Sequence, residues 1–107
     1  MDEKNFSLPS VTGMQKQIVE LQRLAMKDEL SGLMNRDTLE RRIKERLANM
    51  MPEETCALFI VDLDDFKRVN DTLGHQAGDQ AIRQTGRVLS GMFRASDIVG
   101  RLGGDEF

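Results

Sequence analysis

Apolar residues near the start of the chain recur with the spacing of an amphipathic helix. They lie three or four positions apart: Val11, Met14, Ile18, Leu21 and Ala25. This spacing predicts a coiled-coil seam of about two heptads, which is too short to be a stable helix by itself. The helix therefore either packs on its own domain or serves as a dimer stalk or linker. Residues 1–10 mix charged residues with Asn, Ser and Pro, and we expect a frayed leader there.

A continuous apolar segment, residues 57–61, predicts a buried strand. Acidic residues follow it directly: Asp62, Asp64 and Asp65. A helical pattern then begins at Phe66 and stops at Gly74. Carboxylates at a strand end can hold a hard cation, and the free N–H groups at a helix start favour anions. The segment therefore suits a metal-bound polyphosphate, although acids that simply cap the helix would give the same pattern.

Two more helices are predicted on either side of this segment. The first is capped by Asn35 or Asp37 and ends before Pro52. The second spans about residues 79–93, and Gly86 is expected to weaken it locally.

A hairpin is predicted at the end of the sequence. Residues 98–102 form a short strand pattern, and Gly103 and Gly104 tolerate the positive φ angles that a tight turn needs. Phe107 would begin the returning strand, which leaves that arm of the hairpin without a full partner. Either another chain supplies the partner strand, or the sequence is a fragment of a larger domain.

Composition narrows the class of protein. The chain has 107 residues, of which 31% are charged, and its net charge of −3 argues against broad attraction to nucleic acid. A single cysteine rules out an intrachain disulfide and favours a reducing compartment. The sequence contains neither a signal-peptide pattern nor a membrane span, so we expect a cytoplasmic protein without membrane contact in this segment.

Four separated motifs resemble those of the GGDEF family, the diguanylate cyclases. Residues 28–36, DELSGLMNR, are similar to the family's opening DxLTGLxNR, with Ser in place of Thr. Residues 62–79 resemble its D-x-D-x-F-K-x-x-N-D…G-H…G-D block, and residues 94–97 resemble its RxxD inhibitory motif. Residues 103–107 are the signature GGDEF itself. Four motifs in the family's order and spacing make this a specific match.

The resemblance implies an α+β fold with a palm-like βαβ core of the nucleotide-cyclase or ferredoxin-like type. Residues 28–107 would be the N-terminal portion of that domain, preceded by a leader and linker helix in residues 1–27. It also implies that two GTP molecules, one on each subunit of a homodimer, condense to cyclic di-GMP with release of two pyrophosphates. Two Mg²⁺ ions per site, or Mn²⁺ in their place, would serve as cofactors.

By resemblance, each site residue takes a role. Asp62 and Asp105 would hold the metal ions with the backbone carbonyl of Leu63. Asp105 would also accept a proton, with Glu106 beside it as a second acid, and Lys67 would neutralise phosphate charge. For this, the strand end at Asp62 and the hairpin tip at Asp105 must be neighbours on adjacent antiparallel strands.

Substrate contacts are implied in the same way. The backbone amides of Asp65 and Phe66 would contact phosphate oxygens at the helix start. Asn70 and Asp79 would bind the guanine edge, because an amide can donate and accept while a carboxylate accepts from the N1–H and the N2 amino group of guanine. His75 would lie near the ribose or the base.

Arg94 and Asp97 would form a product-inhibition site for cyclic di-GMP, although a simple surface ion pair would use the same residues. Because family domains continue well past the signature, we expect these 107 residues alone to be weakly active or inactive. Two other interpretations are a non-catalytic module that senses cyclic di-GMP through Arg94 and Asp97, and a swapped or aggregating fragment without a ligand.

Overall fold

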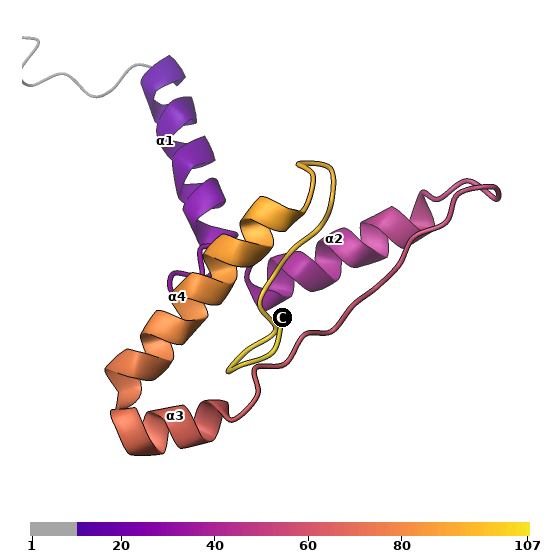
Figure 1. The fold of residues 1–107 in the computed structure, drawn as a ribbon. Coiled ribbons are helices and arrows are strands. Elements are labelled where there is room, and N and C mark those ends of the chain that lie inside the picture. Colours follow the sequence, from indigo (N-terminus) through magenta and orange to yellow (C-terminus); the bar gives the residue numbers. More distant parts are fainter. Residues whose placement is uncertain (1–10) are drawn as a thin grey trace, which may run out of the picture.

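The computed structural model describes residues 11–107, and the predicted leader lies outside this part of the chain. Four helices make up most of the described structure: α1 Val11–Ala25, α2 Arg36–Ala48, α3 Phe66–Leu73 and α4 His75–Met92. In residues 11–107 the expected sheet is represented only by isolated bridges between extended segments, so the structure has fewer strands than predicted (Figure 1). None of the helices within this range is long and apolar enough to cross a membrane.

Helix α1 confirms the predicted N-terminal helix and shows its apolar seam uncovered. None of its residues is buried, and it points away from the rest of the molecule (Figure 1). Val11, Ile18 and Leu21 are all exposed. Nothing within residues 11–107 covers the seam, and its role as a dimer stalk or linker stays a prediction.

Helix α2 is fixed by its N-terminal cap. Asn35 is in an extended conformation, and its side-chain oxygen accepts a hydrogen bond from the backbone N–H of Thr38 at 3.0 Å. Asn35 rather than Asp37 is therefore the cap, because its oxygen satisfies a donor that the helix leaves free. Thr38 and Leu39 in the first turn are buried.

Helix α4 begins earlier than predicted. It starts at His75, directly after Gly74, so residues 74–78 do not form a separate loop. Gly74 has φ of 92°, which lets the chain end α3 and begin α4 at the same residue. A small core then forms between α4, the turn before α2 and the end of the chain: Leu33, Ile82, Leu89 and Phe107.

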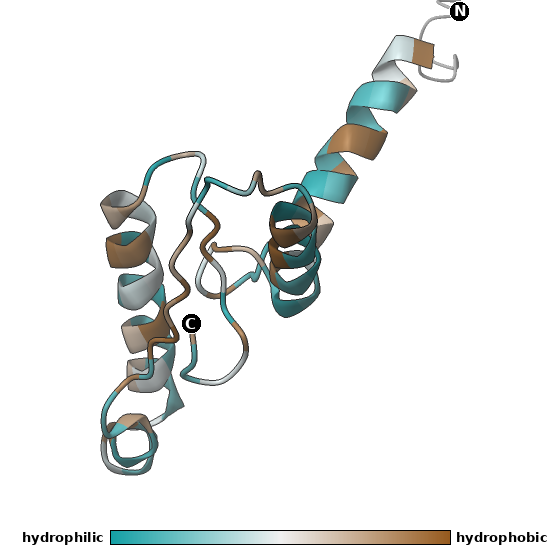
Figure 2. Ribbon diagram, turned by 90° about the vertical axis from the view of Figure 1, so that its right-hand side faces the viewer, coloured by the Kyte–Doolittle hydropathy of each residue, from teal (hydrophilic) through white to brown (hydrophobic). Residues whose placement is uncertain are grey.

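The expectation that residues 57–61 form a buried strand is wrong for this structure. They are extended but exposed, with Phe59 at 71% of its full accessibility. Figure 2 shows this apolar segment passing beside the C-terminus. An apolar segment is buried only if other segments cover it, and among the described residues only Phe107 pairs with its end, at Val61.

Gly86 is a packing position rather than a weakness of α4. It is buried, and a Cβ at this position would overlap the backbone carbonyl oxygen of Ser31 and lie 2.9 Å from the carbonyl carbon. The absence of a side chain therefore allows α4 to approach the turn before α2 at backbone distance.

We predict opposite effects for two glycine substitutions in α4. Gly86→Ala should lower the free energy of unfolding by about 1–3 kcal/mol, because the added carbon must displace backbone. Gly91→Ala is the matched control: a Cβ there meets no atom within 4 Å, so it should raise that free energy by about 0.5–1 kcal/mol. Urea unfolding followed by circular dichroism measures both. Equal effects of the two substitutions would contradict the close approach at Gly86.

Candidate functional site

The predicted neighbours at the strand end and the hairpin tip do lie side by side. Val61 and Phe107 exchange two backbone hydrogen bonds, at 2.7 and 2.8 Å. The N–H of Leu63 donates to the carbonyl of Asp105 at 3.2 Å, and Asp62 forms an antiparallel bridge with Glu106. Residues 61–63 therefore run antiparallel to residues 105–107, and this pairing brings Asp62 next to Asp105.

The GGDEF signature forms the predicted tight turn. Gly103 and Gly104 both have positive φ, at 147° and 53°. The N–H of Glu106 donates to the carbonyl of Gly103, and the N–H of Leu102 donates to the carbonyl of Glu106, both at 2.9 Å. Side chains other than glycine rarely adopt these angles, so the two glycines determine where Asp105 is presented.

The carboxylates at this junction repel one another. The pKa of Asp62 is raised, first by a hydrogen bond shared with Asp105, then by partial desolvation and by the charges of Asp105, Glu106 and Asp64. A cation between Asp62 and Asp105 would relieve this repulsion. Within residues 11–107 no group of three or more His, Cys, Asp or Glu side chains is arranged to hold a metal. Two carboxylates still fit Mg²⁺, which commonly takes one or two from the protein and its other oxygens from substrate phosphate and water.

The acids do not simply cap α3. Asp65 is the N-cap residue, but its side chain makes no capping hydrogen bond. Its backbone lies in the left-handed region, with φ of 57° and ψ of 26°, which is uncommon for a residue other than glycine. Such strain is often found at functional sites, where the surrounding structure maintains it. The first turn of α3 is thus open, and Lys67 within it is exposed.

Helix α3 packs against α4, and this packing places the Asn70 side chain at the start of α4. The Asn70 side chain lies directly on Gly78, where a Cβ would overlap its amide oxygen. Asn70 is partly buried by this contact, whereas His75 and Asp79 are exposed. The structure therefore places Asn70 next to the residue that precedes Asp79, and leaves the Asp79 carboxylate accessible to a ligand.

Arg94 and Asp97 form a turn after α4. The N–H of Arg94 donates to the Asp97 carboxylate at 2.9 Å, and the N–H of Asp97 donates to the carbonyl of Arg94 at 2.9 Å. The Arg94 side chain is 89% exposed, and its Nε is 4.0 Å from the Asp97 carboxylate. The ion pair with Asp97 therefore occupies little of the Arg94 guanidinium, and the rest of this group is accessible to a ligand.

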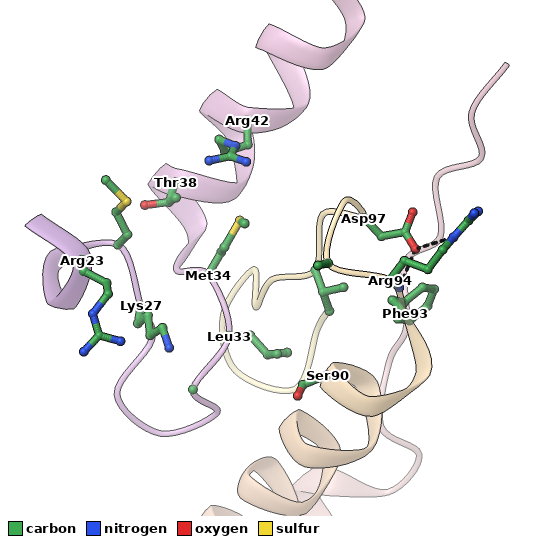
Figure 3. A pocket seen from close by; sticks show the side chains of 14 residues that line it. Arg23, Lys27, Leu33, Met34, Thr38, Arg42, Ser90, Phe93, Arg94 and Asp97 are labelled. Carbon is green, nitrogen blue, oxygen red and sulfur yellow. Dashed lines mark hydrogen bonds and ion pairs between the residues drawn. The ribbon is translucent and has the colours of Figure 1, made fainter. Parts of the chain in front are cut away.

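The sequence did not reveal the cationic surroundings of this turn. It lines an open pocket of about 540 Å³ that Arg23, Lys27 and Arg42 also line (Figure 3). They come from α1, from the segment after it and from α2, so no local motif joins them. In Figure 3 the Arg94 guanidinium points away from these three residues, so an anionic ligand in the pocket would meet the charges of Arg23, Lys27 and Arg42 before that of Arg94.

Asp28 and Arg101 form a second contact that sequence reasoning missed. Nη1 of Arg101 lies 3.2 Å from one carboxylate oxygen of Asp28 and 3.3 Å from the other. Burial alone would raise the pKa of Asp28, but hydrogen bonds from Ser31 and from Arg101 and the charge of Arg101 outweigh it, so the pKa is lowered. The two residues are 73 positions apart, and only their opposite charges could have suggested the pair.

Comparison with known proteins points to the same family as the sequence motifs do. The family model for "Diguanylate cyclase, GGDEF domain" matches residues 25–107. The probable diguanylate cyclase DgcE of Escherichia coli K12 is 39% identical over 101 residues, which cover 94% of this chain and 9% of that protein.

Solved structures match as well. A sensory box/GGDEF family protein from Caulobacter crescentus is 41% identical with a TM-score of 0.66, over 77% of this chain and 53% of that one. The coiled coil and GGDEF domain of DgcB from Caulobacter crescentus, in complex with c-di-GMP, is 29% identical with a TM-score of 0.80, over 91% of this chain and 51% of that one. The chain thus spans less than a tenth of DgcE and about half of each solved chain.

We predict that Asp105→Asn lowers the pKa of Asp62 towards its ordinary value. The substitution removes the neighbouring negative charge and the carboxylate that shares a hydrogen bond with Asp62, so Asp62 should release its proton at lower pH. Carboxyl chemical shifts followed by NMR during a pH titration measure the change. Asp37→Asn, on α2, is the control and should leave the Asp62 titration unchanged. An Asp62 pKa that does not fall in Asp105→Asn would contradict the coupling.

Proposed function

Because the chain belongs to the GGDEF family of diguanylate cyclase domains, we propose that it forms the N-terminal part of a site that condenses two GTP into cyclic di-GMP. The observation that supports this most directly is the antiparallel pairing of residues 61–63 with residues 105–107. It joins two motifs more than forty positions apart into one acidic pair, Asp62 and Asp105.

Asp62, Asp105 and the carbonyl of Leu63 would hold Mg²⁺. When bound, the ions would neutralise triphosphate charge and lower the pKa of the attacking hydroxyl. Lys67 would add positive charge near the phosphates, and the open first turn of α3 would offer the N–H groups of Asp65 and Phe66.

Guanine recognition would fall to the start of α4. Asn70 is held against Gly78, so its amide is positioned before a ligand arrives. The exposed Asp79 carboxylate can accept hydrogen bonds from the N1–H and the N2 amino group of guanine, a pair of donors that adenine does not present. His75 begins the same helix and would lie near the ribose or the base.

In the reaction, the 3′-oxygen of one GTP attacks the α-phosphorus of the other. A new P–O bond forms, the bond from the α-phosphorus to the bridging oxygen of the β-phosphate breaks, and pyrophosphate leaves. Asp105 would accept the proton from the 3′-hydroxyl, with Glu106 as a second acid. Two chains must face each other with one GTP each, and the exposed seam of α1 is suited to hold such a dimer together.

We predict that the chain binds GTP with Mg²⁺ and forms at most a small amount of cyclic di-GMP at high protein concentration. GTP with Mg²⁺ should shift the amide resonances of residues 62–79, and the product detected by chromatography should disappear in Asp62→Ala. Asp37→Asn is the control and should behave as the unmodified chain. The proposal fails if GTP with Mg²⁺ leaves residues 62–79 unshifted, or if turnover survives Asp62→Ala.

The exposed Arg94 and the cationic pocket around it favour a second function, binding of cyclic di-GMP. This would serve as product inhibition in an active cyclase or as sensing in a module without turnover. We predict that Arg94→Ala weakens this binding roughly ten- to a hundredfold, the effect of losing a charge-assisted hydrogen bond of about 1.5–3 kcal/mol. Calorimetry measures the affinity. Arg87→Ala on α4, outside the pocket lining, is the control, and equal affinities of the two variants would exclude the role of Arg94.

A further inference from the structure

One arginine side chain joins two distant parts of the fold. The Arg101 guanidinium donates through Nε and Nη2 to the carbonyl oxygen of Gly104, at 3.0 and 2.7 Å. Through Nη1 it donates to the carboxylate of Asp28, at 3.2 and 3.3 Å. Only 15% of the Arg101 side chain and 23% of the Asp28 side chain are exposed. This is unlike the exposed pairs on α1 and α2, whose energetic contribution is small.

The Asp28 end of the contact is rigidly held. The Asp28 carboxylate accepts the N–H of Ser31 at 2.7 Å, and the Asp28 backbone bonds to Gly32 and to Leu33. The same turn rests on α4, because the Ser31 carbonyl packs against Gly86. It is also fastened to the end of α1, since the Asn35 side chain donates to the carbonyl of Ala25 at 2.7 Å.

The Gly104 end of the contact determines the geometry of the acidic pair. The carbonyl of Gly104 belongs to the peptide unit that leads into Asp105, so two hydrogen bonds to its oxygen fix the plane of that unit. Gly104 has φ of 53° and no side chain, and by itself it would allow this plane to rotate. Arg101 removes that freedom.

We propose that Arg101 is a positioning residue that makes the orientation of Asp105 depend on Asp28 and on the turn after α1. A change in the turn that moves Asp28 would move the guanidinium, and with it the peptide unit before Asp105. The affinity of the Asp62–Asp105 pair for a divalent cation would then change. This last step rests on the cation site proposed above, whereas the dependence of the hairpin on Asp28 does not.

The first test follows the hairpin without any metal. Asp28→Asn and Arg101→Met should each shift the amide resonances of Gly104 and Asp105, because Asp28 bonds to the guanidinium that in turn bonds to the carbonyl of Gly104. In an Arg101→Met background, Asp28→Asn should add no further shift there, because the link is already absent. Arg101→Lys keeps the charge but not the planar fork, so it should resemble Arg101→Met at the hairpin. If Arg101→Met fails to fold, Arg101→Lys replaces it in this cycle.

The control is another arginine that donates to a backbone carbonyl. Arg46 on α2 bonds to the carbonyl of Ser96 at 2.7 Å, so Arg46→Met removes a similar contact away from the hairpin. It should leave Gly104 and Asp105 unshifted. The proposal is overturned if Asp28→Asn shifts only residues 28–33 and Arg101, or if its effect on Asp105 is the same with and without Arg101.

The second test measures cation affinity by paramagnetic broadening with Mn²⁺. Asp28→Asn and Arg101→Lys should each weaken Mn²⁺ binding at Asp62 and Asp105 roughly three- to tenfold, the effect expected from losing one or two well-oriented hydrogen bonds. Unchanged affinity in both variants would overturn the coupling to the cation site. If Mn²⁺ does not broaden Asp62 and Asp105 in the unmodified chain, the cation site is wrong, while the hairpin shifts decide the positioning role independently.

Discussion

The antiparallel pairing of Val61 with Phe107 is the contact on which the rest of the structure depends. Two backbone hydrogen bonds at this pair set the register of residues 61–63 against residues 105–107. A shift by one residue would remove Glu106 from its place opposite Asp62 and turn the buried side chain of Phe107 away from the core. Phe107 is also part of the small core with Ile82 and Leu89, so the same contact anchors the hairpin to α4.

The acidic pair Asp62 and Asp105 is electrostatically unfavourable by itself, and the proposed cation site depends on this. Asp62 and Asp105 are close enough for the pKa of Asp62 to rise, so the fold holds negative charges together against their repulsion. A divalent cation would turn this repulsion into attraction, and the triphosphate that comes with it would find open N–H groups at the start of α3. Asp65, directly before the first turn of α3, has a strained backbone, and strain of this kind is often found at functional sites.

The N-terminal side of the molecule has one connection to each of the two proposed ligand sites. Arg23 and Lys27 line the same pocket as Arg94, so a ligand there would contact both the stalk and the domain. The turn after α1 reaches the hairpin through Asp28 and Arg101. Helix α1 itself buries no residue, and Asn35 connects its end to this turn through hydrogen bonds to the carbonyls of Ala25 and Met26. These are the contacts through which an upstream movement would reach the acidic pair.

The spacing of apolar and glycine residues was enough to predict the helices from Val11 and Phe66 and the glycine turn at residues 103 and 104, and the motifs were enough to predict the family. Spacing and φ preference act over a few residues, so they can be read without a fold. Only the tertiary structure decided that residues 57–61 are exposed, that Gly86 is a packing contact, and that Arg101 bonds Asp28. The start of α4 at His75 was also missed, because a glycine that ends one helix can begin the next when the two helices pack together. Each of these depends on which distant segments meet, and burial and pairing between distant residues leave no periodic signal in one sequence.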